Sequence, residues 1–203
     1  MLRTKALITG ITGMVGSHLV DFLLSETDWD IYGMCRWRSP LDNVSHLLDR
    51  ANRSDRLKFL SADLRDYISL LNVVEEVRPD YVFHLAAQVG VRYSVVNPKK
   101  YIRVNKIGFR NLLNNFKNKD FKVMFYASSS SVYGDTKKFP LKENFNLKPK
   151  NLYAKTKVGN ETDAKNFEKK FKKKLIGIRF FTVYGEWGRP DMILLKLLNR
   201  CKN

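Results

Sequence analysis

The sequence predicts an α/β fold in which one doubly wound parallel sheet carries helices on both faces. Short apolar runs rich in Val, Ile and Leu alternate with longer stretches of helical period, which is typical of parallel strands joined by helices. Glycines three residues apart follow the first apolar run. No repeat, low-complexity tract or linker divides the chain, so residues 1–203 are expected to form a single domain.

Each predicted strand is a short apolar run bounded by polar or turn residues, and its composition indicates burial on both faces of the sheet. In chain order we expect strands at Lys5–Thr9, Ile31–Cys35, Leu57–Leu60, Tyr81–Leu85, Val123–Ala127 and Leu175–Arg179. The stretches between them have helical period. They predict helices at Val15–Leu24 after the glycines, Tyr67–Val77 closed by Pro79, Tyr101–Phe116, Leu152–Phe171 capped by Asn151, and one beginning near Met192.

Charge and cysteine content limit the class of protein. The formal net charge is +17, but lysines are dense over residues 137–174, where they suit the solvated face and last turn of a helix, so no nucleic acid partner is predicted. Two distant cysteines favour a reducing compartment, and we expect a cytoplasmic protein. Glycines interrupt the first apolar run, so neither a signal peptide nor a membrane span is predicted. The three histidines lack metal-ligand spacing, and no metal is predicted.

The glycine turn predicts a dinucleotide site. Gly10, Gly13 and Gly16 stand between a buried strand and an amphipathic helix, where glycine allows a tight turn and close approach of a pyrophosphate. The helix N-terminus, at Met14 and Val15, then faces the phosphates. A glycine triplet alone is weak evidence, and its strand-turn-helix context strengthens it.

The end of the second strand favours NADP over NAD. An acidic residue that would bind the ribose hydroxyls is absent there, and Arg36 and Arg38 are suited to a 2′-phosphate. The alternative is that both arginines are ordinary surface residues. The ends of the third and fourth strands supply further expected cofactor contacts, with Asp63 assigned to adenine, namely Asp63, Leu64, Leu85, Ala86, Ala87 and Gln88.

A serine run and a Tyr-Lys pair predict oxidoreductase chemistry. Tyr153 and Lys157 are four residues apart on one face of a helix, where the ammonium and a cationic nicotinamide would both favour the phenolate. The pair alone is common by chance. Residues 128–131 are all serine at the end of the fifth strand, where a hydroxyl can hydrogen-bond the reacting group.

With these motifs in order, the whole chain resembles the extended short-chain dehydrogenase/reductase family, whose cofactor domain has the Rossmann-type fold. Residues 90–192, with Val91-Arg92-Tyr93-Ser94 and the segment 179–192, are similar to UDP-glucuronate 4-epimerases. Residues 1–88, with the segments 36–43 and 77–81, are more similar to GDP-mannose 4,6-dehydratases, which use NADP. The cofactor is therefore expected to be NADP or NAD.

The resemblance implies roles for individual residues. Ser129, Ser130, Tyr153 and Lys157 would be catalytic, the last two also contacting the cofactor, with Asn105 supporting the cofactor site. Arg92 and Thr182 would contact the nucleotide sugar, and Arg189 would hold the sugar carboxylate. Dehydratases of this family carry a glutamate two positions after the catalytic Ser or Thr, but this chain has Ser131 there, which favours epimerisation.

Three interpretations stay open: a UDP-glucuronate 4-epimerase, an NADP-dependent GDP-mannose 4,6-dehydratase-like enzyme, and an inactive cofactor-binding fragment. Members of the family carry a smaller C-terminal lobe that closes over the nucleotide sugar. This chain ends at Asn203, so the lobe is expected to be largely missing. The resemblance also implies a homodimer through helices 101–116 and 152–171.

Overall fold

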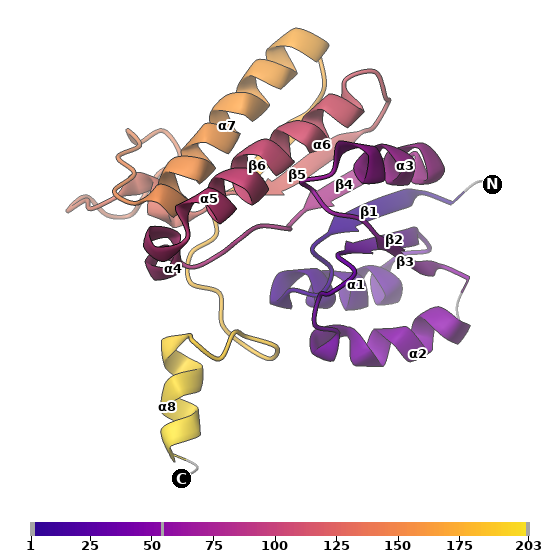
Figure 1. Ribbon diagram of the computed structural model, residues 1–203, viewed down its shortest axis with the longest axis horizontal. Helices are drawn as coiled ribbons and strands as arrows, with labels where there is room; N and C mark the ends of the chain where they lie inside the picture. Colours follow the sequence, from indigo (N-terminus) through magenta and orange to yellow (C-terminus); the bar gives the residue numbers. More distant parts are fainter. Residues whose placement is uncertain (1–2, 54, 202–203) are drawn as a thin grey trace.

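The computed structural model describes residues 3–53 and 55–201. Its centre is a six-stranded sheet in the order β3-β2-β1-β4-β5-β6, with every neighbouring pair parallel (Figure 1). The predicted parallel α/β fold is confirmed. The strands are β1 (Lys5–Thr9), β2 (Asp30–Cys35), β3 (Leu57–Ser61), β4 (Tyr81–His84), β5 (Val123–Ala127) and β6 (Leu175–Ile178).

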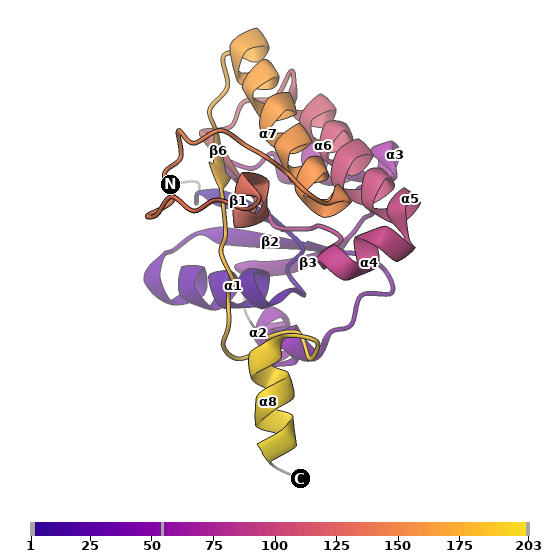
Figure 2. The same ribbon diagram turned by 90° about the vertical axis from the view of Figure 1, so that its left-hand side faces the viewer.

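Helices cover both faces of the sheet (Figures 1 and 2). One face carries α1 and α2, and the other carries α3, α6 and α7. A further helix, α8, projects away from the sheet in both views. Their bounds are α1 (Met14–Glu26), α2 (Ser45–Arg53), α3 (Tyr67–Val77), α4 (Val91–Val96), α5 (Pro98–Tyr101), α6 (Gly108–Phe116), α7 (Leu152–Phe171) and α8 (Ile193–Cys201).

Two apolar cores hold the layers together. Under α1 and α2, Val20, Leu23 and Leu47 pack on the sheet. On the opposite face Leu112 of α6 and Phe167 of α7 pack on it, and both are buried. Side chains point alternately to the two faces of a strand, so apolar residues are required on both sides, which accounts for the unbroken apolar runs in the sequence.

Sequence and structure differ in a few elements. Leu85 and Arg179 lie just beyond their strands, because β4 and β6 end one residue earlier. The helix expected from residue 101 begins at Pro98 and contains a π-helical turn, η2 (Ile102–Ile107). Helices α2 and α4 and the 3₁₀ turns η1 (Asp42–Val44) and η3 (Ser130–Tyr133) were not predicted.

The strand order places the candidate site. From β1 the chain adds β2 and β3 on one side of the sheet, and then β4, β5 and β6 on the other side, so the order of the strands reverses between β1 and β4. Ligands of open α/β sheets bind outside the carboxyl ends of the strands at such a point. Within the described residues, no helix has both the length and the apolar character that crossing a membrane requires.

Candidate functional site

A cavity of about 610 Å³ opens at the carboxyl ends of the strands, and its volume suits a small-molecule ligand. It brings together most of the residues singled out from the sequence. Arg38, Arg92, Asn105 and Ser130 are not part of its lining. The predicted residues that line it are Gly10, Gly13, Met14, Val15, Gly16, Arg36, Asp63, Leu64, Leu85, Ala86, Ala87, Gln88, Ser129, Tyr153, Lys157, Thr182 and Arg189.

The glycine turn is closely packed against the loop after β4 and against the start of α1. Gly10 has φ of 76°, and a Cβ there would lie 2.7 Å from the backbone nitrogen of Ala86. A Cβ on Gly16 would overlap the carbonyl oxygen of Gly10. Helix α1 begins at Met14 with no side-chain cap and no acidic residue in its first turn. Its N-terminal N–H groups therefore have the environment in which a phosphate binds, and the turn fits a dinucleotide.

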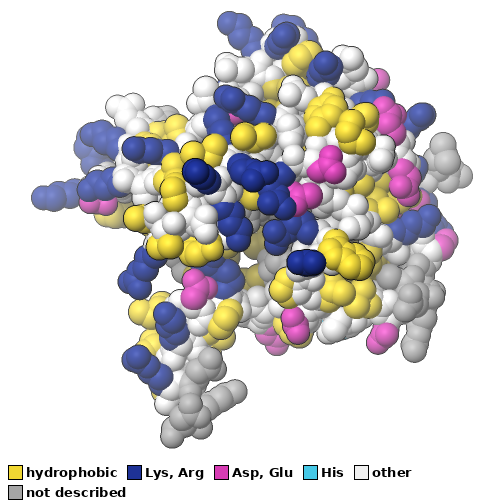
Figure 3. All heavy atoms as spheres, viewed as in Figure 1, with side chains coloured by type: hydrophobic (Ala, Val, Ile, Leu, Met, Phe, Trp, Pro, Cys, Tyr) yellow, Lys and Arg dark blue, Asp and Glu magenta, His cyan; other side chains and the backbone are white. Residues whose placement is uncertain are grey.

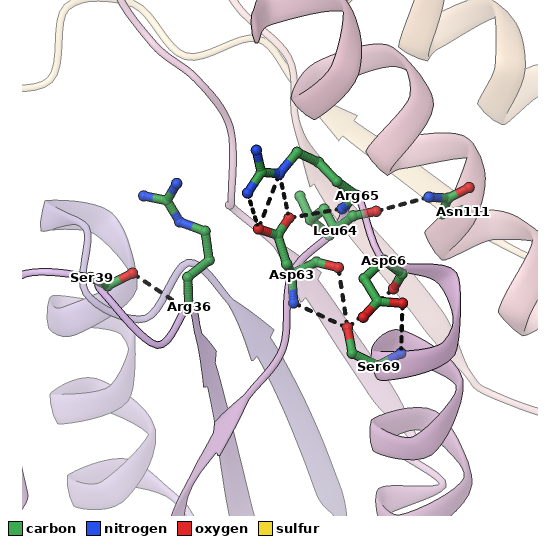
Figure 4. Close-up of polar contacts among 8 residues, drawn as sticks. All are labelled: Arg36, Ser39, Asp63, Leu64, Arg65, Asp66, Ser69 and Asn111. Carbon is green, nitrogen blue, oxygen red and sulfur yellow. Dashed lines mark hydrogen bonds and ion pairs between the residues drawn. The ribbon is translucent and has the colours of Figure 1, made fainter.

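Arg36 and Asp63 lie at the end of the cavity formed by β2 and β3 (Figure 4). The backbone N–H of Arg36 donates to Ser39 Oγ at 3.2 Å, and its guanidinium has no hydrogen bond or ion pair among the described residues. Asp63 is paired with Arg65, whose hydrogen bonds are the main reason that the pKa of this carboxyl lies below its usual value. Arg36 is therefore available to an anion at this end.

Among the described residues, three basic side chains, those of Arg36, Lys157 and Arg189, line the cavity. Figure 3 shows Lys and Arg gathered near the centre of the face seen in Figure 1. A positive field of this kind raises the local concentration of polyanions such as dinucleotides.

Asn105 is buried next to the cavity and holds one of its lining loops in place. It is 2% exposed and lies in the π-helical turn, a deviation that is common at functional sites. Its amide oxygen accepts from the Gln88 backbone N–H at 2.7 Å, while Nδ2 donates to the Gln88 carbonyl at 3.0 Å. Nδ2 also donates to Thr156 Oγ1 at 3.2 Å. The side chain thus fixes the loop after β4 against α7 without lining the cavity.

Tyr153 and Lys157 share one face of α7, whose predicted cap Asn151 accepts from the Ala154 N–H at 2.9 Å. Lys157 Nζ lies 5.8 Å from the Tyr153 ring centroid and donates to the Ala127 carbonyl at 2.7 Å. Burial lowers the pKa of Lys157 to about 8. Burial also raises the pKa of Tyr153, an effect opposed by a hydrogen bond with Ser129 and the charge of Arg189.

The serines are arranged around Ser129. The backbone N–H of Ser131 donates to Ser129 Oγ at 3.2 Å, and the Ser131 hydroxyl lies 2.9 Å from it. Because Ser131 donates to Ser129, the Ser129 proton is left to donate toward Tyr153. Ser130 instead donates its backbone N–H to the Phe180 carbonyl at 2.9 Å and stays outside the lining. Ser131 therefore orients the hydroxyl that meets the tyrosine.

A buried ion pair lies behind this serine loop. Glu161, four residues after Lys157 on α7, accepts from Ser128 Oγ at 2.5 Å and from two nitrogens of Arg179 at 2.9 and 2.8 Å. Arg179 also donates to the Tyr133 hydroxyl and to a loop carbonyl, each at 2.9 Å. The network joins α7, the end of β5 and the residue after β6. The sequence analysis did not single out Glu161; the signal that could have found it is its spacing of one helical turn from Lys157 and two from Tyr153.

The segment after β6 crosses the mouth of the cavity to reach α1 and α2. Asn43 Nδ2 donates to the carbonyl of Thr12 at 3.2 Å and to that of Trp187 at 3.3 Å. The Trp187 ring stacks on His46 with centroids 5.9 Å apart. These contacts bring Arg189 into the lining, where its Nε pairs with Asp191 at 3.2 Å.

The buried ammonium predicts a pH effect on stability. The pKa of Lys157 falls from 10.5 to about 8 on folding, so the unfolded chain binds more protons between these values. The free energy of unfolding should therefore gain a contribution that grows from about pH 8 to about pH 10.5. We expect Lys157→Met to remove this contribution in urea unfolding measured across that range. The same slope in both proteins would contradict the burial of a charged Lys157.

Comparison with known proteins identifies the family of this chain. The family described as "GDP-mannose 4,6 dehydratase" matches residues 7–201. The chain belongs to the extended short-chain dehydrogenase/reductase family. Among relatives, Protein CapI of Staphylococcus aureus is 38% identical over 208 residues, which cover 98% of this chain and 60% of the relative. A probable UDP-glucuronate 4-epimerase of Rhizobium meliloti is also 38% identical, and the match covers 98% of this chain and 59% of that relative.

Solved structures of the family have the same fold. A UDP-glucuronic acid 4-epimerase from Bacillus cereus, in complex with UDP-glucuronic acid and NAD, superposes with a TM-score of 0.88 at 29% identity, covering 98% of this chain and 63% of that one. A UDP-glucose 4-epimerase from Thermus thermophilus with NAD gives a TM-score of 0.84 at 26% identity, and the match covers 97% of this chain and 61% of that one. The chain thus spans about 60% of the length of each of these four proteins.

Proposed function

We propose that this chain forms the cofactor-binding and catalytic part of a nucleotide-sugar 4-epimerase that converts UDP-glucuronate to UDP-galacturonate with NAD. The observation that carries the proposal is the combination of Tyr153, Ser129 and Arg189 in one cavity beside the glycine turn. Relatives named as UDP-glucuronate 4-epimerases support the substrate, and neighbours solved with NAD support the cofactor.

Tyr153 transfers the proton in the proposed reaction, and its neighbours assist it. A nicotinamide bound in the cavity supplies the acceptor and donor for the hydride at C4 of the sugar. Tyr153 takes the proton of the C4 hydroxyl and later returns it, while Ser129 donates a hydrogen bond to the reacting oxygen. Lys157, held by the Ala127 carbonyl, favours the phenolate form of Tyr153 through its charge.

Arg189 is suited to the carboxylate of the sugar. Oxidation of a glucuronate at C4 gives a β-keto acid, which loses carbon dioxide when its carboxylate aligns with the ketone. A guanidinium fork that binds both carboxylate oxygens restrains that alignment. Arg189 lies in the lining with Tyr153, and its charge opposes the rise that burial causes in the pKa of Tyr153. Carboxylate binding and proton transfer would then take place in the same cavity.

Arg36 is expected to set the affinity of the chain for NADP relative to NAD. We expect NAD and NADP each to raise the thermal midpoint of the chain, because a ligand of the native state stabilises it. Replacing Arg36 with alanine should weaken NADP binding about tenfold or more, the effect of a lost charged hydrogen bond, and leave NAD binding nearly unchanged. Arg38→Ala is the matched control outside the lining. Equal losses for both dinucleotides on Arg36→Ala would show that it does not bind a 2′-phosphate.

Product analysis separates the two enzymatic candidates. The epimerase predicts a product of unchanged mass from UDP-glucuronate. The dehydratase-like alternative, favoured by the family match and by Arg36, predicts loss of one water from GDP-mannose. Ser131 stands at the position where dehydratases carry glutamate, and this supports the epimerase. Water loss from GDP-mannose, with UDP-glucuronate unchanged, would overturn the proposed substrate and reaction.

A further inference from the structure

The segment between β6 and α8 makes a strained turn just before Arg189, the Trp187 turn (residues 185–188). Trp187 has a φ of 60°, in the left-handed region that bulky residues rarely occupy. The Gly188 N–H closes the turn by donating to the Gly185 carbonyl at 3.2 Å. A strained backbone persists only where surrounding contacts hold it. The contacts that hold the Trp187 turn therefore help to determine where Arg189 lies.

Three side chains from α1, η1 and α2 hold the Trp187 turn. His18 Nε2 of α1 lies 3.2 Å from the Glu186 carbonyl oxygen. The His46 ring of α2 stacks on the Trp187 ring with an interplanar angle of 6°. Asn43 of η1 donates its Nδ2 to the Trp187 carbonyl at 3.3 Å. Figure 2 shows the segment passing α1 and reaching α2, as these contacts require.

Asn43 differs from the two histidines because it also contacts the glycine turn. Its Nδ2 donates to the Thr12 carbonyl at 3.2 Å as well as to that of Trp187. An amide nitrogen carries two protons, so both are used. Thr12 stands between Gly10 and Gly13, and the Gly13 N–H donates to the Gly10 carbonyl at 3.0 Å. One side chain therefore joins the Trp187 turn to the glycine turn.

Arg189 depends on its own segment for its position. Its Nε pairs with Asp191 at 3.2 Å, and its Nη2 lies 3.5 Å from the Met192 sulfur. Among the described residues, these are the hydrogen-bond and ion-pair partners of its guanidinium, and both lie within three residues of it along the chain. They move together with the segment. The place of Arg189 in the cavity lining is therefore set by what holds the backbone of that segment.

We propose that Asn43 is a positioning residue that holds Arg189 where it can bind the sugar carboxylate, and thereby sets the preference for a uronate over a neutral sugar. This role rests on the proposed function, in which Arg189 binds that carboxylate. A guanidinium fork binds both oxygens of a carboxylate only in a defined geometry. A segment released from Asn43 therefore loses affinity for the charged sugar, whereas a sugar without a carboxylate is little affected.

The test compares UDP-glucuronate with UDP-glucose, which has a hydroxymethyl group in place of the carboxylate. Calorimetry at saturating NAD gives both dissociation constants for the unaltered chain, Asn43→Leu, Arg189→Met and the double variant. We expect the unaltered chain to prefer UDP-glucuronate by about tenfold or more, the effect of a hydrogen bond to a charged group, and Arg189→Met to show little preference. Asn43→Leu, which removes both donors, should lower the preference by about threefold or more, the scale of one lost hydrogen bond.

Two further variants separate positioning from a general structural effect. In the Arg189→Met background, Asn43→Leu should change the preference no further, because it acts through Arg189. The matched control is Asn115→Leu. Asn115 Nδ2 also donates to two carbonyls, those of Tyr67 and Asn111, and it lies outside the cavity lining. This control should keep the preference of the unaltered chain.

The preference for UDP-glucuronate distinguishes failure of this role from failure of the proposed function. If Asn43→Leu weakens both UDP-sugars, or NAD, and leaves the preference unchanged, Asn43 is merely structural and the inference is overturned. An equal fall in Asn115→Leu would overturn it too. An unaltered chain that binds NAD but shows no preference for UDP-glucuronate would overturn the proposed role of Arg189 itself, and the inference with it.

Discussion

Replacing Tyr153 with phenylalanine is expected to lower the rate of UDP-glucuronate epimerisation by about 10²–10⁴-fold, the usual contribution of a positioned acid/base group. Phenylalanine keeps the ring, which packs edge-on against Tyr101 with centroids 6.3 Å apart, so the fold and the cavity should survive. The rate would be measured by chromatography of the two UDP-sugars, with NAD binding checked by thermal shift on the same preparation.

Tyr93→Phe is the matched control for this variant. Tyr93 is 42% exposed and its hydroxyl accepts from Asn97 at 3.2 Å, outside the cavity lining. Its removal should leave the rate unchanged. A Tyr153→Phe variant that keeps the rate of the control would show that another group moves the C4 hydroxyl proton.

Replacing Glu161 with alanine is expected to lower the free energy of unfolding by about 3–5 kcal/mol, because it leaves a buried guanidinium without its partner. The side chains of Glu161 and Arg179 are only 8% and 16% exposed. Ser128 would lose its acceptor as well, so the serine loop should loosen together with the fold. Urea unfolding followed by circular dichroism measures the change.

The control for this variant is the exposed pair of Lys150 and Asp135, whose side chains are 62% and 79% exposed. Asp135→Ala should cost less than about 1 kcal/mol. Burial raises the pKa of Glu161, but hydrogen bonds from Arg179 and Ser128 outweigh it and the pKa lies below its usual value. The contribution of Glu161 should therefore be present above the unfolded pKa of about 4.3 and be lost in more acidic solution. Equal losses of unfolding free energy in Glu161→Ala and Asp135→Ala would contradict the buried pair.

The sheet could be predicted because parallel strands buried on both faces give unbroken apolar runs, and each strand lies within one residue of its expected bounds. Helix α2 gave no such signal. Its sequence SHLLDRANR has few apolar residues, of which Leu47 packs on the core. The six residues of α4 are too few to show a helical period. Such elements are determined by tertiary contacts rather than by local pattern.

Motifs with fixed spacing located most of the candidate site. Gly10, Tyr153 and Lys157 line the cavity because the strand-turn-helix and one-turn spacings determine where such residues lie. The partners of these residues could not be predicted in the same way. Glu161 meets Arg179 through the folding of β6 beside β5, and only the structure distinguishes Ser129 from Ser130. Pairings between distant segments depend on tertiary geometry that spacing alone does not give.

The most direct test of the central claim follows the hydrogen at C4 of the sugar. UDP-glucuronate deuterated at C4 would be incubated with the chain and NAD in ordinary water, and the products examined by NMR and mass spectrometry. Transient oxidation at C4 predicts UDP-galacturonate that keeps the deuterium at C4, because that hydrogen never exchanges with solvent. Product with the deuterium lost to water, or no UDP-galacturonate from a chain that binds NAD, would contradict the proposed function.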